Sequence, residues 1–405
     1  MEYLKGKRIL LGVTGGIAAY KCCELIRLLR KAGAGVRVVM TPAAEQFITP
    51  LTLATLSGAE VLRELFPSGG SVDHISSVRE ADLLILAPAT ANTLAKMAGG
   101  IADNLLTCCL LAARIPVLAA PAMNCAMYEN PATAANICTL RERGVHFVGP
   151  DVGWQACGES GPGRMSAPEA IFREAADLLL RPGQIRGTMV ITAGPTEEPL
   201  DPVRTLTNRS SGRMGYALAG AAAMLGWRVR LISGPVTLDP PPAVDLIPVR
   251  TAAEMMDAAW REAKEADCFV GCAAVADFRP DHAARNKIKK CGEESLKLTL
   301  VPNPDIIRTI AGLDTVLAVG FAAETEHLAE YARHKLATKD LDLIVANDVS
   351  STETGFGSED NAALMIFRDG REVSLPRMRK EDMALRIISE INDLLDRQSR
   401  ESAPV

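Results

Sequence analysis

The chain reads Gly187-Thr-Met-Val-Ile-Thr-Ala-Gly-Pro-Thr-Glu-Glu-Pro199 and, a few residues later, Thr207-Asn-Arg-Ser-Ser-Gly-Arg-Met-Gly215. The first segment is an apolar run that ends in a glycine turn at Gly194. The N-terminus has the same arrangement in Arg8-Ile-Leu-Leu-Gly-Val-Thr-Gly-Gly16. An apolar strand that runs into a glycine-rich turn is typical of the start of a nucleotide-binding α/β domain. Two such starts predict two nucleotide-handling domains on one polypeptide.

Composition narrows the class of protein. A length of 405 residues predicts two domains rather than one core. The formal net charge of −5 predicts no general attraction for nucleic acid or for an anionic membrane, so an anionic substrate needs a local basic patch. The longest apolar stretch, 105–121, is interrupted by Arg114 and Pro116 and predicts a helix, a turn and a strand rather than a membrane span. The first apolar run ends without a signal-peptide cleavage site, and we expect a cytoplasmic protein.

The ten cysteines contain no CxxC pair and no cysteine–histidine cluster with the spacing of a zinc site. We expect buried, reduced thiols, with Cys157 as the exception because it lies in a glycine-rich segment. A thiol in such a segment can reach a ligand and exchange a proton with it.

Strands and helices are predicted to alternate through both halves, which implies parallel sheets with right-handed crossovers. In the first half we expect strands at 8–13, 36–40, 83–87 and 117–120, and helices at 17–31, from 41–42, at 71–80 and at 168–180. In the second half we expect strands at 189–193, 228–232, 268–273, 316–320 and 342–346, helices at 212–225, 251–264, 304–311 and 324–338, a hairpin of 362–367 with 372–375, and a last helix from about residue 379.

Three segments are predicted to be irregular. Asp151 to Met165 is so rich in glycine that we expect a mobile flap. Residues 181–187 are expected to be a linker, which divides the chain into domains 1–183 and 184–405. Residues 281–294 are polar and basic and are expected to form a flexible loop.

Polar loops follow the predicted strands of the first half. Gly15 and Gly16 begin the first turn, Thr41 follows the second strand, and the loop 88–92 follows the third. The first turn is neither GxGxxG nor a P-loop, so a plain tight turn and a phosphate site both remain open. Ligands of open α/β sheets bind at the carboxyl ends of the strands, which favours a site at this edge.

Several single polar residues are candidate site residues. Spacing alone leaves His74 an ordinary surface or core histidine, whereas Asn124 is either a helix cap or a donor to substrate. Asn208 begins a segment that is either a helix start or an anion cradle. The basic run at Lys287 is either a solvated face or a clamp for a triphosphate, and Asp277, at a predicted strand end, favours the clamp.

Several motifs together resemble one family. They are Gly15-Gly-Ile-Ala-Ala-Tyr-Lys21, Pro121-Ala-Met-Asn124, Ala156-Cys-Gly158 with Gly161-Pro-Gly-Arg-Met165, Ile191-Thr-Ala-Gly-Pro-Thr196, Asn208-Arg-Ser-Ser-Gly212, Ala273-Ala-Val-Ala-Asp277 and Lys287-Ile-Lys-Lys290. From about residue 7 to residue 392, the chain resembles the bacterial bifunctional phosphopantothenoylcysteine decarboxylase / phosphopantothenate–cysteine ligases of coenzyme A biosynthesis. The resemblance implies a flavodoxin-like or Rossmann-like doubly wound N-terminal domain and a Rossmann-like α/β ligase domain with an added β-hairpin.

For the first half, the resemblance implies a decarboxylase that holds FMN. The flavin oxidises the substrate thiol so that the carboxylate can leave, and it then reduces the product. By analogy His74 is the base, Asn124 holds the carboxylate and Cys157 is the proton donor. The residues against FMN would be Gly15, Ile17, Thr41, Thr90 and Asn92.

For the second half, the resemblance implies a ligase that uses CTP to activate phosphopantothenate as an acyl-cytidylate, which the amine of cysteine then attacks. Asn208 would contact the acyl intermediate, and Lys287 would neutralise developing negative charge. The family's nucleotide site matches Gly271, Cys272, Ala273, Asp277, Lys287, Pro304, Asp305, Ile306, Ile307, Phe321, Lys335 and Lys339. Mg²⁺ or Mn²⁺ would accompany the triphosphate, on ligands that the sequence leaves unknown.

The resemblance also implies a homo-oligomer, a dodecamer built from decarboxylase trimers and ligase dimers, that acts on small molecules. Two other classes stay open. A regulatory flavin-binding protein is disfavoured by Cys157 and by the ligase half. An NAD-binding reductase is disfavoured by the missing GxGxxG.

Overall fold

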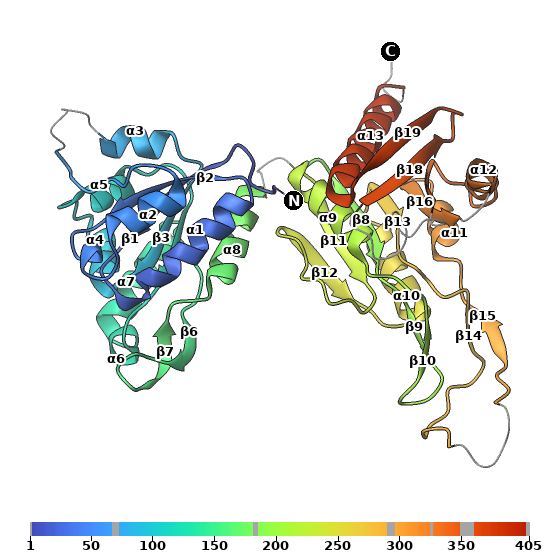
Figure 1. Cartoon of the computed structure of the whole chain (residues 1–405), viewed down its shortest axis with the longest axis horizontal. Coiled ribbons are helices and arrows are strands. Elements are labelled where there is room, and N and C mark those ends of the chain that lie inside the picture. The colour runs from blue at the N-terminus through green and yellow to red at the C-terminus, as the bar shows by residue number, and fades with distance from the viewer. Residues whose placement is uncertain are drawn as a thin grey trace. The chain divides into compact units, whose positions relative to one another are not determined.

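The computed structural model describes residues 2–66, 73–180, 185–289, 296–324, 327–348 and 360–401. The chain divides into two compact units, Glu2–Leu180 and Arg181–Val405. Both are α/β units, and Figure 1 shows the first in blue to green and the second in green to red. The predicted domain boundary after residue 183 falls at 181–184, outside the described residues.

The first unit is built on five parallel strands in the order β2-β1-β3-β4-β5. The strands are β1 (Arg8–Val13), β2 (Gly35–Met40), β3 (Leu83–Ala89), β4 (Val117–Pro121) and β5 (His146–Phe147). This is the flavodoxin-like order, in which the direction of winding reverses between β1 and β3. Every residue of β3 is buried, as expected for an inner parallel strand with helices on both faces. The predicted doubly wound sheet is confirmed.

Helices cover both faces of this sheet (Figure 1). In chain order they are η1 (Ile17–Lys21), α1 (Cys22–Lys31), η2 (Ala44–Gln46), α2 (Pro50–Ser57), α3 (Asp73–Arg79), α4 (Ala91–Gly99), α5 (Leu105–Ala112), α6 (Cys125–Tyr128), α7 (Pro131–Glu142) and α8 (Pro168–Leu180). α1 packs against α8 on one face, while α4, α5 and α7 pack together on the other. Leu84 and Leu86 of β3 join Leu106 of α5 in the core beneath the second group.

The second unit contains an eight-stranded sheet in the order β12-β11-β8-β13-β16-β17-β18-β19. The strands are β8 (Thr188–Ala193), β11 (Arg228–Ser233), β12 (Val244–Pro248), β13 (Cys268–Gly271), β16 (Leu317–Glu324), β17 (Leu343–Asp348), β18 (Asp360–Phe367) and β19 (Glu372–Arg379). The six strands from β12 to β17 are parallel, and β18 and β19 form the predicted antiparallel hairpin at one edge. The predicted Rossmann-like domain with an added hairpin is therefore confirmed.

Two short antiparallel ribbons leave this sheet: β9 (Glu197–Pro199) with β10 (Thr205–Thr207), and β14 (Phe278–Pro280) with β15 (Leu300–Pro302). The helices are α9 (Arg213–Met224), α10 (Ala252–Ala263), α11 (Ile306–Ala311), α12 (Leu328–Thr338) and α13 (Lys380–Glu401). α9 packs against β8, β11 and α13, whereas α10 and α11 pack together beside β8 and β13. A Cβ at Gly215 would lie 2.5 Å from the Cβ of Ala193, so glycine allows α9 to approach β8 closely.

The segment Asp151–Met165 corrects a prediction. It is not irregular, because β6 (Asp151–Trp154) and β7 (Ser160–Arg164) pair as an antiparallel hairpin. Its glycines permit close packing instead: a Cβ at Gly163 would lie 2.3 Å from the carbonyl oxygen of Met123, and one at Gly161 would lie 2.8 Å from the Cβ of Cys125. The hairpin is therefore seated on the segment that follows β4.

The predicted loop 88–92 is also wrong in part. β3 continues through Ala89, and α4 begins at Ala91 with Thr90 as its N-cap. The pairing of β3 with β4 shifts register between Leu86 and Ala89, which lets a proline occupy the end of the strand. The helix expected from residues 41–42 appears only as the short 3₁₀ turn η2.

The cysteines are free, as expected, among the described residues. Burial is not uniform, however, because Cys138 is exposed as well as Cys157. Cys138 lies on the solvent-exposed side of α7, and the sequence pattern of this helix does not show which side faces solvent. No helix in the described segments is long and apolar enough to cross a bilayer.

Candidate active sites

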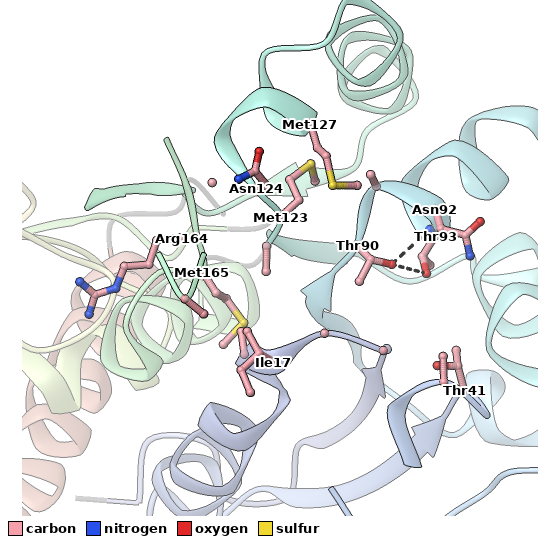
Figure 2. Close-up of a pocket in the computed structure, with 18 of the residues that line it drawn as sticks. Ile17, Thr41, Thr90, Asn92, Thr93, Met123, Asn124, Met127, Arg164 and Met165 are labelled. Carbon is pink, nitrogen blue, oxygen red and sulfur yellow. Dashed lines mark hydrogen bonds between the residues drawn. The ribbon is translucent and has the colours of Figure 1, made fainter. Parts of the chain in front are cut away.

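A cavity of about 890 Å³ lies at the carboxyl ends of β1 to β4 in the first unit. Each of these strands contributes residues that follow it, and the hairpin β6–β7 supplies another wall (Figure 2). The cavity brings together seven residues that the sequence predicted for this site: Gly15, Ile17, Thr41, Thr90, Asn92, Asn124 and Cys157. They converge because parallel strands end at one edge of their sheet.

Close packing and hydrogen bonds fix the floor of this cavity. The buried hydroxyl of Thr14 donates to the carbonyl oxygen of Pro88 at 2.5 Å and lies 3.5 Å from the Thr90 hydroxyl. A Cβ at Gly15 would lie 2.5 Å from the Cβ of Ala43, so the turns after β1 and β2 touch. The turns after β1, β2 and β3 therefore form one rigid surface beneath a ligand.

The lining suits a flat, largely apolar cofactor with polar edges. The Thr41 hydroxyl oxygen is buried and has no hydrogen-bond partner in the protein, so a bound group can satisfy it. Ile17, Met127 and Trp154 line the cavity, and each leaves about half or more of its surface exposed. Apolar side chains exposed at a cavity are typical of a ligand site.

Lys21 is a lining residue that the sequence analysis did not assign. Its ammonium donates to the carbonyl oxygen of Met165 at 2.6 Å. Burial lowers the pKa of Lys21, and the nearby Arg164 guanidinium acts in the same direction. Lys21 lies four residues after Ile17, and in an α-helix this spacing places two residues on the same face. That spacing could have indicated Lys21 as a second lining residue, although η1 is a 3₁₀ turn.

Asn124 and Cys157 are in contact. The Asn124 amide nitrogen donates to the Cys157 sulfur at 3.2 Å and to a carboxylate oxygen of Glu159 at 2.6 Å. Asn124 also caps α6, because its side-chain oxygen accepts from the backbone N–H of Ala126 at 2.9 Å. The helix-cap interpretation of Asn124 is therefore confirmed, and its role as a donor to substrate stays a prediction. Glu159 was not predicted from the sequence. His74 lies in α3, and its side chain is outside the described residues.

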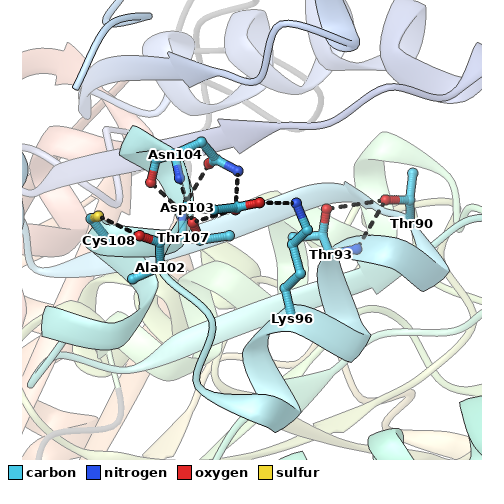
Figure 3. A network of polar contacts seen from close by, with 8 residues as sticks. All are labelled: Thr90, Thr93, Lys96, Ala102, Asp103, Asn104, Thr107 and Cys108. Carbon is cyan, nitrogen blue, oxygen red and sulfur yellow. Dashed lines mark hydrogen bonds and ion pairs between the residues drawn. The ribbon is translucent and has the colours of Figure 1, made fainter. Parts of the chain in front are cut away.

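A polar network forms the cavity wall beyond α4 (Figure 3). Lys96 pairs with Asp103 at 2.5 Å, and this hydrogen bond to Lys96 is the main cause that lowers the pKa of Asp103. Asp103 also accepts from the Asn104 amide at 3.0 Å and from the Thr107 hydroxyl at 3.3 Å. Asn104 in turn caps α5. The network holds the turn between α4 and α5 in place.

The second unit places some of its predicted residues, Asn208 and Gly271 to Ala273, around the end of β13. The Thr192 hydroxyl accepts from the backbone N–H groups of Cys272 and Ala273, both at 3.2 Å. The Asn208 amide donates to the carbonyl oxygens of Ala274 and Val275 at 3.2 and 3.0 Å. β8, β10 and β13 are thereby joined at the carboxyl edge. Burial raises the pKa of Cys272 to about 12, so this thiol stays protonated at neutral pH.

α11 brings further predicted residues to the same edge. Gly271 faces Ile307, whose side chain would lie 3.0 Å from a Cβ at that glycine. Asp305, which follows Pro304, caps α11 and pairs with Lys339 at 3.0 Å. The remaining residues of the predicted nucleotide site lie on different elements. Ile306 is buried in α11, and Phe321 lies in β16. Lys335 lies on α12, four residues before Lys339, and Asp277 is exposed beside β14.

Lys287 lies in the predicted basic loop, of which residues 281–289 are described. This part has no helix or strand, as predicted, but it is anchored. The buried carboxylate of Asp201 accepts from the backbone N–H of Ile288 at 3.1 Å, and the Arg204 guanidinium donates to the carbonyl oxygen of Ile288 at 3.0 Å. Burial raises the pKa of Asp201, but the N–H donors of Ile288, Val203 and Arg204 outweigh it and hold that pKa below its usual range.

No group of three or more His, Cys, Asp or Glu side chains within the described segments could hold a metal ion.

Together, the flavodoxin-like sheet and the cavity at its winding reversal define the first unit as a doubly wound α/β unit with a candidate ligand site at the carboxyl edge of its sheet. The family model described as "Flavoprotein" matches residues 2–180, and the model described as "DNA/pantothenate metabolism flavoprotein C-terminal domain" matches residues 185–395.

Full-length relatives define the family more closely. The chain is 47% identical to the "Coenzyme A biosynthesis bifunctional protein CoaBC" of Vibrio parahaemolyticus, over 98% of this chain and 100% of that protein. It is also 47% identical to the protein of that name from Escherichia coli, over 98% and 99%. A crystal structure of the C-terminal domain of such a protein is 37% identical and covers 52% of this chain and 97% of that chain, with a TM-score of 0.45. The chain belongs to the family of coenzyme A biosynthesis bifunctional proteins.

The unpartnered hydroxyl of Thr41 leads to a first prediction. Thr41→Val keeps the shape of the side chain and removes the hydroxyl, so the cofactor-free protein should be equally stable or up to about 1 kcal/mol more stable. Flavin affinity should fall about three- to tenfold, the equivalent of one neutral hydrogen bond. Thermal unfolding of the cofactor-free protein and titration with flavin measure the two effects. Thr55→Val, on the exposed face of α2, is the control, and equal flavin affinity in Thr41→Val and the unsubstituted protein would contradict a contact with the cofactor.

Proposed function

We propose that the chain catalyses two steps of coenzyme A biosynthesis. Residues 184–405 join cysteine to phosphopantothenate with CTP, through an acyl-cytidylate. Residues 1–183 decarboxylate the resulting phosphopantothenoylcysteine to phosphopantetheine with FMN. The observation that carries the proposal is the full-length identity of 47% to curated bifunctional relatives, over both units and all of the relative's length.

In the decarboxylase unit, FMN when bound supplies the oxidation of the substrate thiol and the later reduction of the product. The chain's own residues bind and move protons. Asn124 is to hold the carboxylate until it leaves as CO₂, and Cys157 is to donate a proton to the decarboxylated intermediate, whose reduction then gives the product. Their contact at 3.2 Å supports a shared site, since a proton donor and a carboxylate holder must both face the same small substrate. His74 is assigned the role of base by family analogy.

The residues fit FMN in three respects. Gly15 and the start of η1 present backbone N–H groups for the phosphate. Thr41 supplies an unpartnered hydroxyl, and Ile17 supplies an exposed apolar surface for the ring system. Thr90 and Asn92, at the start of α4, complete the predicted contacts.

In the ligase unit, the loop after β13 is to bind CTP together with α11, Phe321, Lys335 and Lys339. Lys287 is to neutralise negative charge as the acyl-cytidylate forms. Asn208 is to contact the acyl group through its side-chain oxygen, because its amide nitrogen is engaged by the β13 loop. Mg²⁺ or Mn²⁺ is to arrive with the triphosphate of CTP. The assembly proposed is a dodecamer of decarboxylase trimers and ligase dimers.

One reaction mixture tests the proposal. Protein with FMN, phosphopantothenate, cysteine, CTP and Mg²⁺ should form phosphopantetheine, CO₂ and pyrophosphate, detected by mass spectrometry and a pyrophosphate assay. Lys287→Gln should slow ligation at least about a hundredfold and leave decarboxylation of supplied phosphopantothenoylcysteine unchanged. Cys157→Ser should release CO₂ but accumulate product that has not been reduced.

Three results would contradict parts of this scheme. Full reduced product from Cys157→Ser at the normal rate would exclude Cys157 as the proton donor. Equal pyrophosphate release with ATP would exclude specificity for CTP. Loss of both activities in Lys287→Gln would assign that residue to folding rather than to ligation.

The anchoring of Ile288 gives a further prediction. Asp201→Asn removes the charge that receives the backbone N–H of Ile288, so the neighbouring Lys287 should be misplaced and the kcat of ligation should fall roughly ten- to hundredfold. If Asp201 acts through Lys287, the same substitution should add little in a Lys287→Gln background. Pyrophosphate release by the single and double variants measures this coupling.

Two controls accompany that cycle. Decarboxylation by the other unit of the same chain reports intact protein, and Asp257→Asn, exposed on α10, makes the same change of charge away from Lys287. Equal fold losses from Asp201→Asn in both backgrounds would show that Asp201 does not act through Lys287.

A further inference from the structure

The amide of Asn124 already holds a carboxylate, that of Glu159. The distance from the amide nitrogen to the carboxylate oxygen is 2.6 Å, which is shorter than the 3.2 Å to the Cys157 sulfur. The Asn124 side-chain oxygen is occupied as the cap of α6. Both polar atoms of this side chain are therefore engaged before any substrate binds.

Glu159 is the centre of a cluster. The same carboxylate oxygen lies 3.7 Å from the Cys157 sulfur and 3.5 Å from the Cys125 sulfur, and both thiols donate to it. Donation by Asn124, then by the two thiols, holds the pKa of Glu159 below its usual range. Glu159 is thus an anion at neutral pH, with the same charge and geometry as the carboxylate of an acyl-cysteine.

The turn that carries Glu159 does not depend on this contact. The backbone N–H of Gln155 donates to the carbonyl oxygen of Glu159 at 2.8 Å. The side-chain oxygen of Gln155 accepts from the backbone N–H of Cys125 at 3.1 Å. The Gln155 amide nitrogen also donates to the carbonyl oxygen of Pro162 at 3.1 Å. The hairpin is fixed to α6 through its backbone and Gln155, so the exposed Glu159 side chain can leave Asn124 while the turn stays in place.

We propose that Glu159 occupies the place of the substrate carboxylate, and that an acyl-cysteine substrate binds by displacing Glu159 from Asn124. This rests on the proposed decarboxylase function. Displacement lowers the apparent affinity for the substrate, because only the fraction of molecules with a free Asn124 amide can bind it productively. The decarboxylated product has no carboxylate, so it cannot compete with Glu159. Glu159 can return to Asn124 once CO₂ has left, so this competition lowers the affinity for the substrate and leaves the affinity for the product unchanged.

Substitution of Glu159 tests this with a change of definite sign. Glu159→Ala frees the Asn124 amide, and the KM for phosphopantothenoylcysteine should fall about three- to tenfold without an increase in kcat. The inhibition constant of phosphopantetheine should stay within about twofold, because the product does not use Asn124. Glu159→Gln keeps a neutral, weaker acceptor and should give a smaller decrease in KM.

Glu129→Gln is the matched control, since Glu129 is exposed at the end of α6 and loses the same charge without a contact to Asn124. An unchanged or raised KM in both Glu159 variants would overturn the proposal. Equal gains in affinity for substrate and product would also overturn it, since they would indicate a general opening of the hairpin. Absence of decarboxylation by the unsubstituted protein would instead refute the proposed function itself.

Discussion

The covering of a parallel sheet by helices on both of its faces governs where polar residues can lie along the strands of this protein. Strand β3 is buried along its whole length, and the parallel strands β8 and β13 have the same environment. Side chains within such strands contribute packing, because an unpaired polar group there would lose its hydration without compensation. Many of the polar site residues therefore lie just beyond the strand ends, and the parallel direction brings those residues to a single edge. This arrangement occurs in both units.

Both sites also require that neighbouring backbone segments approach each other closely. Glycine residues permit this approach in both units. Gly15 lets the turn after β1 touch Ala43, and Gly215 lets α9 lie against Ala193. Gly163 does the same for the hairpin β6–β7, whose backbone passes close to the carbonyl oxygen of Met123. In each case a Cβ would force apart two segments that carry site residues. These glycines therefore permit close packing of segments that carry site residues, and within 151–165 this allows a glycine-rich segment to form the paired hairpin β6–β7.

The site residues that follow the ends of strands could be predicted from the sequence. Thr41, Thr90 and Asn124 each follow a buried apolar run, so their convergence follows from the parallel topology, and the structure places them around one cavity. Contacts made across turns could not be predicted. Glu159 meets Asn124 only because the hairpin folds back onto α6, and Asp201 meets Ile288 across 87 residues of chain. Short ribbons such as β9–β10 were missed as well, because three residues are too few to establish a period of two.

The two carboxylates illustrate how burial decides what a charged side chain can do next to a reactive group. The buried carboxylate of Asp201 accepts hydrogen bonds from three backbone N–H groups and interacts with the Arg204 guanidinium. If this carboxylate lost its contact with Ile288, a buried negative charge would lose a partner without gaining contact with water. It can serve only as a permanent anchor for the segment that carries Lys287. Glu159 is exposed, and when it leaves Asn124 water can solvate it at little cost. An exposed carboxylate can therefore exchange with an incoming one, whereas a buried carboxylate cannot, and the exchangeable one lies at the amide that we propose for the substrate carboxylate.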